Sequence, residues 1–307
     1  MGTTWHVTAV GRAGATGLQE KIDRRLEEVN ATFSTYIEDS EINRFSRFAR
    51  AGEEFPASRD FLHVMRTASR VYELSGGAWD GTVRPLVDLW GFGPRPPVAE
   101  PPDPKAIEAL LSEVGFDTIE IRPGALVKRR ASVTLDLSSI AKGYGVDQAA
   151  EVIRQEGFGD FIVEIGGEVY AAGSRRGGGP WRVGINRPRS DASPDEVYRV
   201  APLRDAAFAT SGGYRNFFAR DGVRYSHILD PRTGRPVANG VVSVSVRAPT
   251  CTLADGLATA VIVMGLESGI ALLERLPDVE GLVVVETREG RLEDHPTSGF
   301  RSEPPPG

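Results

Sequence analysis

The chain has 307 residues, of which 40% are hydrophobic and 25% are charged, and its formal net charge at pH 7 is -6. This composition is typical of a globular protein with one large domain or two modest ones. An acidic chain is a poor candidate for nucleic-acid binding, because that binding depends on basic surface. The single cysteine, Cys251, excludes an intrachain disulfide and a cysteine-cluster metal site.

No apolar run approaches the ~18 residues that a membrane helix requires. The first residues, Met-Gly-Thr-Thr-Trp, lack the basic-then-apolar pattern of a signal peptide. From the chain as given we therefore expect a cytoplasmic protein without a transmembrane segment. Because no internal repeat or long linker is visible, we expect a single domain over residues 1–300 and a flexible proline-rich tail over residues 301–307.

In the first half of the chain, apolar spacing and capping residues predict helices. The predicted helices run from Leu18 to Asn30, from Ser58 to Gly76-Gly77, and from Asp103-Pro104 to Gly115. Beyond residue 130, strands dominate. They are expected at 161–165, 168–172, near 226 and at 242–246, with one helix near 252–264 and a last hairpin formed by 282–286 and 291–292. Strands that follow one another through short turns favour an α+β fold with largely antiparallel sheet.

The run from residue 133 to Asp147 joins an alternating segment to a helix start. Residues 133–137 alternate between apolar and polar, which predicts a half-buried strand, and Ser138 and Ser139 are suited to cap a helix beginning near residue 140. The free N–H groups of a helix start favour anions, and Lys142 adds a cation. With Asp136 one step upstream, the run is either a site for a phosphorylated molecule or an ordinary strand-to-helix turn.

Asp255 and Thr259 form a second candidate site. Their spacing of four places them on one helix face. A carboxylate and a hydroxyl there suit Mg²⁺, which uses few protein ligands and keeps phosphate or water in its other positions. The alternative is a capping box from Thr252 to Asp255, and both interpretations hold if different oxygens are used.

Three further residues have two interpretations each. His227, at a strand end, could bind phosphate or shuttle a proton, but an isolated histidine is more often structural. Trp79 and Tyr36 could pack on a planar ring or belong to the core. The chain has no dinucleotide-binding glycine motif after a strand, no P-loop and no Gly-x-Ser-x-Gly elbow.

Taken together, eight runs in this order resemble the ApbE family of FAD:protein FMN transferases. The runs are residues 1–3, 33–44, 75–94, 136–144, 164–168, 210–216, 226–236 and 248–259. They cover nearly the whole chain, and their collinear order makes the resemblance specific. It implies an ApbE-like α+β fold, with largely antiparallel sheets flanked by helices and the FAD site between two sub-structures.

The resemblance further implies post-translational flavinylation. Such an enzyme cleaves FAD with the help of Mg²⁺, attaches FMN through a phosphodiester bond to a Thr or Ser hydroxyl of a target flavoprotein, and releases AMP. The implied FAD contacts are Met1, Tyr36, Ala78, Trp79, Asp80, Asp136, Lys142 and Leu229. The implied metal ligands are Ser139 (or in its place the Ala141 carbonyl), Asp255, Ala258 through its carbonyl, and Thr259.

The resemblance also places His227 near the phosphates. The acceptor hydroxyl belongs to the partner, so the enzyme has to supply only a base, and the sequence does not choose between Asp255 and His227. An FAD pyrophosphatase that uses water, or a non-catalytic FAD-binding carrier, remains an alternative function. Many family members carry a secretion signal or a lipoprotein cysteine, which leaves the compartment open.

Overall fold

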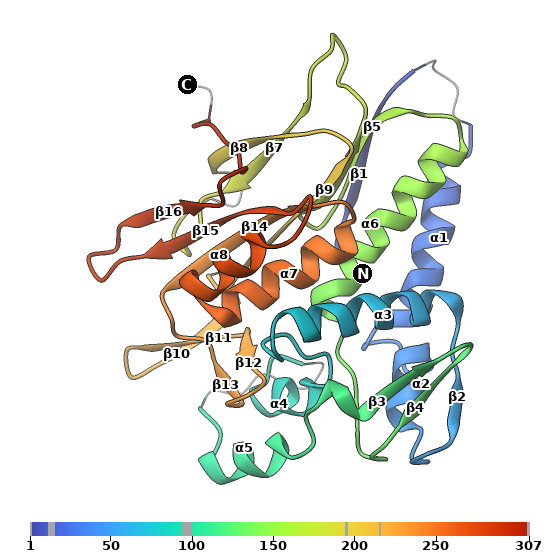
Figure 1. Cartoon of the computed structure of the whole chain (residues 1–307), viewed down its shortest axis with the longest axis vertical. Coiled ribbons are helices and arrows are strands. Elements are labelled where there is room, and N and C mark those ends of the chain that lie inside the picture. Colours follow the sequence, from blue (N-terminus) through green and yellow to red (C-terminus); the bar gives the residue numbers. More distant parts are fainter. Residues whose placement is uncertain (1, 12–15, 94–99, 194–195, 215, 306–307) are drawn as a thin grey trace. The chain divides into compact units, whose positions relative to one another are not determined.

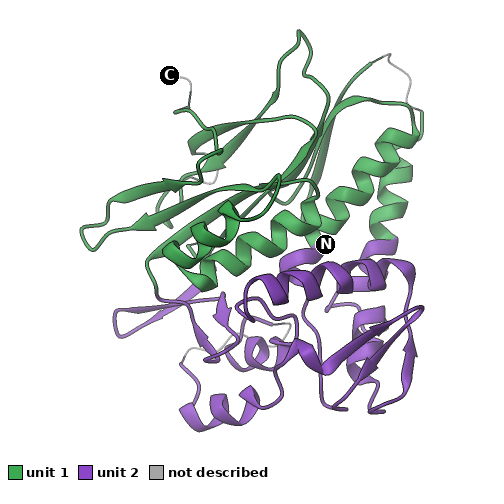
Figure 2. Ribbon diagram, viewed as in Figure 1, with its two compact units in different colours: residues 1–27, 142–215, 239–307 green, residues 28–141, 216–238 purple. Residues whose placement is uncertain are grey.

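The computed structural model describes residues 2–11, 16–93, 100–193, 196–214 and 216–305. The chain divides into two compact units (Figure 2). Unit 1 comprises residues 1–27, 142–215 and 239–307, and unit 2 comprises residues 28–141 and 216–238. The prediction of a single domain over residues 1–300 stays a prediction.

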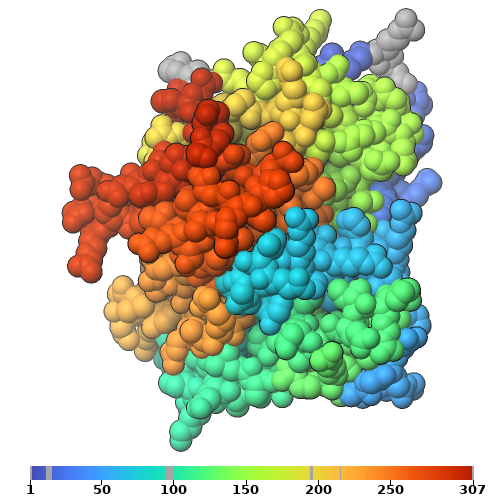
Figure 3. Space-filling view, viewed as in Figure 1, coloured from blue at the N-terminus to red at the C-terminus, as the bar shows by residue number. Residues whose placement is uncertain are grey.

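Unit 1 is built on a seven-stranded sheet in the order β1-β5-β6-β9-β14-β15-β16 (Figure 1). Each neighbouring pair of strands is antiparallel, as expected from the short turns between them. The strands are β1 (Trp5–Val10), β5 (Asp160–Ile165), β6 (Glu168–Ala172), β9 (Ala206–Gly212), β14 (Val241–Ala248), β15 (Glu280–Glu286) and β16 (Leu292–Pro296). The β15–β16 hairpin stands out from the surface of unit 1 (Figure 3).

Helices and a second hairpin complete unit 1. The elements are α1 (Leu18–Phe33), α6 (Ser138–Gln155), α7 (Cys251–Met264), α8 (Leu266–Glu274), β7 (Trp181–Asn186) and β8 (Val197–Leu203). Helix α7 packs on β9 and β14. The β7–β8 hairpin contributes Trp181, Ile185 and Leu203 to a core cluster that also contains Phe208 of β9. The border between the two units falls within α1 and within α6.

Unit 2 combines short helices with a small sheet in the order β2-β4-β3. Its helices are α2 (Glu41–Arg47), α3 (Arg59–Leu74), α4 (Arg84–Leu89), α5 (Pro104–Leu111) and a 3₁₀ turn (Phe116–Thr118). Its strands are β2 (Glu54–Pro56), β3 (Ile119–Arg122), β4 (Ala125–Lys128), β10 (Phe217–Arg220), β11 (Val223–Ser226), β12 (Leu229–Asp230) and β13 (Arg235–Pro236). Trp90 anchors one core cluster, where its indole N–H donates to the Gly234 carbonyl.

The predicted starts of α3 and α5 are confirmed. The Ser58 side chain accepts a hydrogen bond from the amide of Phe61, and the Asp103 side chain accepts one from the amide of Lys105. Helix α1 continues to Phe33, so the predicted end at Asn30 was too early. The reason is that Phe33 is buried and continues the apolar face of the helix past Val29.

The strand predicted at residues 133–137 is not present as a strand. Val133, Leu135 and Leu137 are fully buried, so the alternation is real, but the segment pairs with no described strand. Instead, the amide of Asp136 donates to the Gly81 carbonyl, and the amide of Leu135 donates to the Ser46 hydroxyl. Alternating burial requires an extended backbone but does not require a neighbouring strand.

The two ends of the chain bear on other sequence predictions. Near the C-terminus, Glu303 forms a β-bridge with Val200, and residues 306–307 lie outside the described part. The flexible tail over residues 301–307 stays a prediction. No described helix combines the length and the hydrophobicity needed to cross a bilayer.

Lys128 is an unusual member of the core of unit 2. Its side chain is almost completely buried, its ammonium donates to the Ser46 carbonyl at 3.0 Å, and it lies 4.7 Å from the centroid of the Phe45 ring. Burial lowers the pKa of Lys128 to about 8. The folded protein therefore disfavours the charged form of this lysine, which is charged at neutral pH in the unfolded chain.

We predict that Lys128 makes the free energy of unfolding rise between about pH 8 and pH 10. Below pH 8 the ammonium is charged in both states, whereas above it the folded state releases the proton first and gains stability relative to the unfolded chain. Urea unfolding should show that the free energy of unfolding of wild type, relative to that of the Lys128→Met variant, rises by about 2 kcal/mol from pH 8 to pH 10. The exposed control Lys105→Met should follow wild type, and parallel curves for wild type and Lys128→Met would contradict the prediction.

Candidate functional site

In unit 1, charged side chains from α6, β6 and α7 form a buried cluster. Lys142 lies in the second turn of α6, Glu168 begins β6, and Asp255 lies in the second turn of α7. Asp255 is 3% exposed and Glu168 is 2% exposed. Charged groups are almost never this buried without a partner, so the cluster is the first candidate for a site in unit 1.

Helix α7 is capped by residues other than Asp255. The Thr250 side chain accepts a hydrogen bond from the amide of Leu253, which makes Thr250 the N-cap. The Asp147 carboxylate of α6 accepts hydrogen bonds from the amides of Cys251 and Thr252 and from the Thr252 hydroxyl. The alternative interpretation of Thr252 to Asp255 as a capping box is therefore excluded, because the donors at the helix start are already satisfied and Thr252 serves as a donor.

Asp255 is held instead by α6. Its Oδ2 accepts a hydrogen bond from the amide of Gly143 at 3.0 Å, because α6 and α7 approach closely at this point. A Cβ at position 143 would lie 2.2 Å from the Cys251 carbonyl oxygen and 2.9 Å from the Asp255 Cβ. Only glycine allows this approach without a backbone shift, so Gly143 fixes the position of the Asp255 carboxylate.

The electrostatics of Asp255 follow from its surroundings. Burial raises the pKa of Asp255, while Lys142 and the amide of Gly143 act in the opposite direction. Farther along the same helix, the Thr259 hydroxyl lies 3.0 Å from the Ser211 hydroxyl of β9. Asp255 and Thr259 thus present a carboxylate and an oriented hydroxyl from one helix, as their spacing predicted.

Lys142 is shared between two carboxylates but contacts only one of them directly. Its Nζ lies 2.6 Å from Glu168 Oε1. Burial lowers the pKa of Lys142, but Asp255 and Glu168 outweigh it, so that the net shift is upward. Burial also raises the pKa of Glu168 to about 8, assisted by Asp255 and opposed by Lys142. The second carboxylate oxygen, Glu168 Oε2, is buried and accepts no hydrogen bond.

The oxygen donors around Asp255 fit Mg²⁺ as an ion that takes its other ligands from phosphate and water. The described residues contain no group of three or more His, Cys, Asp or Glu side chains that could hold a metal alone. Mg²⁺ is commonly bound through one or two carboxylates together with substrate phosphates and water, so a single buried carboxylate with a hydroxyl is compatible with it. The Ala258 carbonyl belongs to the same helix, and a carbonyl in a helical hydrogen bond keeps a second lone pair.

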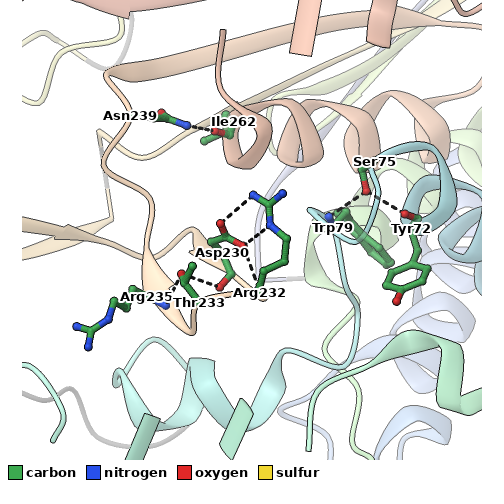
Figure 4. A network of polar contacts seen from close by, with 9 residues as sticks. All are labelled: Tyr72, Ser75, Trp79, Asp230, Arg232, Thr233, Arg235, Asn239 and Ile262. Atoms are coloured by element: carbon green, nitrogen blue, oxygen red, sulfur yellow. Dashed lines mark hydrogen bonds and ion pairs between the residues drawn. The ribbon is translucent and has the colours of Figure 1, made fainter. Parts of the chain in front are cut away.

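In unit 2, Trp79 and Ser139 contact each other. The indole N–H of Trp79 donates to the Ser139 hydroxyl at 2.9 Å, and the Trp79 side chain is 2% exposed. The Trp79 amide donates to the Ser75 hydroxyl, which in turn donates to the Tyr72 carbonyl (Figure 4). The Trp79 ring is therefore packed in the core, while contact of Trp79 with FAD stays a prediction. Ser139 lies inside α6 rather than at its cap.

The carboxylates of Asp80 and Asp136 both accept hydrogen bonds from backbone amides. The Asp80 carboxylate accepts hydrogen bonds from the amide and hydroxyl of Thr82 and from the amide of Phe116, and burial raises its pKa. Asp136 Oδ1 accepts one from the amide of Ser138, so Asp136 rather than either serine satisfies a donor at the start of α6. Contact of Asp80, Asp136 and buried Ala78 with FAD stays a prediction.

Tyr36 lies on an exposed loop whose backbone is held by hydrogen bonds from a buried asparagine. Its side chain is 77% exposed, whereas Asn43 of α2 is buried and donates from Nδ2 to the carbonyls of Ser34, Thr35 and Ile37. The Arg84 guanidinium donates to Asn43 Oδ1 at 2.7 Å. The loop thus presents an accessible aromatic ring on a rigid support, which favours the ligand interpretation of Tyr36 over the core interpretation.

His227 and Leu229 follow each other in a short segment of unit 2. His227 Nδ1 lies 3.0 Å from the Asn216 carbonyl oxygen, which can only accept, so Nδ1 carries the proton in the neutral ring. Leu229 is buried in the cluster with Trp90. The turn after Leu229 is closed by a two-pronged ion pair between Asp230 and Arg232 (Figure 4).

Unit 2 also contains a cavity of about 580 Å³. It is lined by Glu38, Asn43, Ser46, Arg47, Arg84, Pro85, Asp88, Leu110, Glu113, Ser132 and Thr134. None of these described lining residues is a predicted FAD contact, although the cavity borders the support of the Tyr36 loop. Met1, another predicted contact, lies outside the described residues.

Sequence reasoning assigned no role to Gly143, Asp147 or Glu168, although each fixes part of the cluster in unit 1. Glu168 had a weak signal, because it is a charged residue at the start of a strand that continues Val-Tyr-Ala-Ala. Gly143 and Asp147 had none, since their roles depend on contacts with residues of another helix that are more than a hundred positions away in sequence.

Comparison with known proteins identifies the family. The model of the ApbE family matches residues 1–283. A relative from Vibrio cholerae named FAD:protein FMN transferase is 44% identical over 306 residues, which are 98% of this chain and 90% of the relative. The chain belongs to the ApbE family. The ApbE relative of the same name from Salmonella typhimurium is 36% identical over 92% of this chain and 81% of its own length.

Solved structures of ApbE proteins share the fold. The flavin transferase ApbE from Vibrio cholerae superimposes with a TM-score of 0.89 at 42% sequence identity, over 98% of this chain and 95% of that chain. The apo form of the Pseudomonas stutzeri flavinyl transferase ApbE gives a TM-score of 0.86 at 34% identity, over 97% and 92%. The predicted ApbE-like α+β fold with antiparallel sheets is confirmed.

We predict that Gly143→Ala disrupts the contact between α6 and α7. The added methyl would overlap the Cys251 carbonyl, and overpacking of this kind costs about 2 kcal/mol in free energy of unfolding. The matched control is Gly159→Ala, where a Cβ meets nothing within 4 Å. Chemical denaturation measures both, and an equal or higher stability of Gly143→Ala would show that the close approach is not required.

Proposed function

We propose that this protein is an FAD:protein FMN transferase, as the names of its relatives state for them. The observation that carries the proposal is the buried cluster in unit 1, where Asp255 and Thr259 share a helix face and Lys142 lies nearby. A buried carboxylate and a partly exposed ammonium beside an oriented hydroxyl suit the pyrophosphate of FAD, which needs positive charge around it.

In this reaction the acceptor hydroxyl of a Thr or Ser attacks the phosphorus of the FMN half of FAD. The bond between that phosphorus and the bridging oxygen breaks, and AMP leaves with the electron pair on the oxygen. The hydroxyl proton passes to a base. The products are AMP and a target flavoprotein that carries FMN through a phosphodiester bond.

Asp255, Thr259, the Ala258 carbonyl and Ser139 (or the Ala141 carbonyl in its place) would hold Mg²⁺. When bound, the ion would neutralise charge on the pyrophosphate oxygens and orient them. The Lys142 ammonium would add a second positive charge, from the protein itself, that neutralises charge on the pyrophosphate. The remaining assignments, Tyr36, Ala78, Trp79, Asp80, Asp136 and Leu229 as contacts of FAD, are part of this proposal.

His227 is the better candidate for the base. Its Nδ1 proton points at the Asn216 carbonyl, so in the neutral ring the lone pair that accepts a proton is on Nε2. Asp255 is less suited, because in this proposal its carboxylate would hold the metal rather than take a proton.

The test is mass spectrometry of an acceptor domain incubated with the protein, FAD and Mg²⁺. A mass gain of FMN minus water that disappears with EDTA is the expected result. FMN and AMP in solution without an adduct would favour the pyrophosphatase, provided that several acceptor sequences give the same result. Unchanged FAD that remains bound would favour the carrier.

We predict that Asp255→Asn lowers the rate of flavinylation by at least about 100-fold, because the amide keeps the hydrogen bond from Gly143 but loses the charge that attracts a metal. The matched control is Asp294→Asn, whose carboxylate binds Tyr198 and Arg199 at the edge of the sheet. It should keep activity within about twofold. Full activity of Asp255→Asn would refute the metal assignment.

A further inference from the structure

The ion pair between Lys142 and Glu168 has no role in the reaction as written above. The two side chains are unequally exposed, with Glu168 at 3% and Lys142 at 37%. Glu168 follows the Gly166-Gly167 turn and pairs with Ile165 across the β5–β6 hairpin. A carboxylate fixed in the interior of a sheet can orient a long, flexible lysine side chain, whereas the reverse is not true.

Asp255 is the competing partner for the same ammonium. Its carboxylate acts on Lys142 through space, yet in the described part of the chain the ion pair of Lys142 is with Glu168. If Lys142 paired with Asp255 instead, it would occupy the position that a metal ion needs. Because Glu168 forms the ion pair with Lys142, the Asp255 carboxylate is not paired with this ammonium and can bind a metal ion.

We propose that Glu168 is a positioning residue that holds the Lys142 ammonium away from Asp255 and so keeps the Asp255 carboxylate available for Mg²⁺. This inference rests on the metal assignment in the proposed function. It also accounts for the unpartnered oxygen Glu168 Oε2, since the carboxylate is kept for its charge toward a single cation rather than for a full set of hydrogen bonds.

The variant that tests this is Glu168→Gln, which keeps the shape of the side chain and removes its charge. The released ammonium should pair with Asp255, so that Mg²⁺ binds about tenfold more weakly in isothermal titration calorimetry. FAD binding without Mg²⁺ should be unchanged or tighter, because the cluster has lost one negative charge facing an anionic ligand. Measurement at pH 8.5 keeps the wild-type carboxylate largely ionised.

These opposite signs distinguish positioning from simple damage. A structural defect would weaken Mg²⁺ and FAD binding together and lower the melting temperature. The matched control is Glu156→Gln, which removes an ion pair of the same 2.6 Å length between Glu156 on the surface near the end of α6 and Lys21. It should change neither affinity.

A double-mutant cycle with Lys142→Met adds a second readout. If Glu168 acts through Lys142, the effect of Glu168→Gln on Mg²⁺ affinity should shrink several-fold in the Lys142→Met background. An unchanged Mg²⁺ affinity in Glu168→Gln, parallel losses of Mg²⁺ and FAD binding, or an effect that persists in full without Lys142 would each overturn the inference.

The outcome is separable from that of the proposed function. Mg²⁺ titration needs no turnover, so a missing flavin adduct with the expected Mg²⁺ response would refute the transferase and leave the positioning role intact. Absence of Mg²⁺ binding to wild type, or an unchanged affinity in Asp255→Asn, would refute the metal assignment and this inference together.

Discussion

The close approach of α6 and α7 is the constraint on which the candidate site of unit 1 depends. Gly143 allows the two helices to approach closely, and the Asp147 carboxylate accepts hydrogen bonds from the first amides of α7. Together these contacts fix the start of α7 against α6. Asp255 lies one turn further and accepts from the amide of Gly143. The hydrogen bond from this backbone amide offsets part of the cost of burying the carboxylate, which an apolar surrounding could not do.

Burying a charge costs free energy, yet unit 1 has three charged side chains close together at positions where apolar side chains could pack. Glu168, Lys142 and Asp255 leave an excess of one negative charge when all are ionised, while Glu168 Oε2 lacks a hydrogen-bond partner. Stability alone does not explain such an arrangement, because well-packed hydrophobic residues are often as stabilising as a buried ion pair. A polar cluster kept at this cost is characteristic of sites that bind charged ligands.

How much could be read from the sequence depended on the range of the interaction. Ser58 and Asp103 were identified as caps because a cap and the amide it binds lie within three residues. Residues 133–137 alternate in burial as a strand does. Whether another strand pairs with them depends on the tertiary structure, and the alternation of apolar residues does not contain that information. The same limit explains why the sequence alone could not exclude a capping box from Thr252 to Asp255: the group that binds the start of α7 is Asp147, from a distant helix. The residues of the cluster were recognised through collinear motifs, whereas the contacts between them, and the roles of Gly143 and Glu168, required the fold.

Cys251, in the first turn of α7, is the single cysteine of the chain; it is completely buried, and burial raises the pKa of its thiol well above the usual value. Such a thiol reacts slowly with alkylating reagents as long as the helix stays in place. Its modification rate therefore reports how often the start of α7 opens in the native protein. The chain carries its own single-site reporter of local opening beside the residue proposed to bind the metal, and no engineered label is needed.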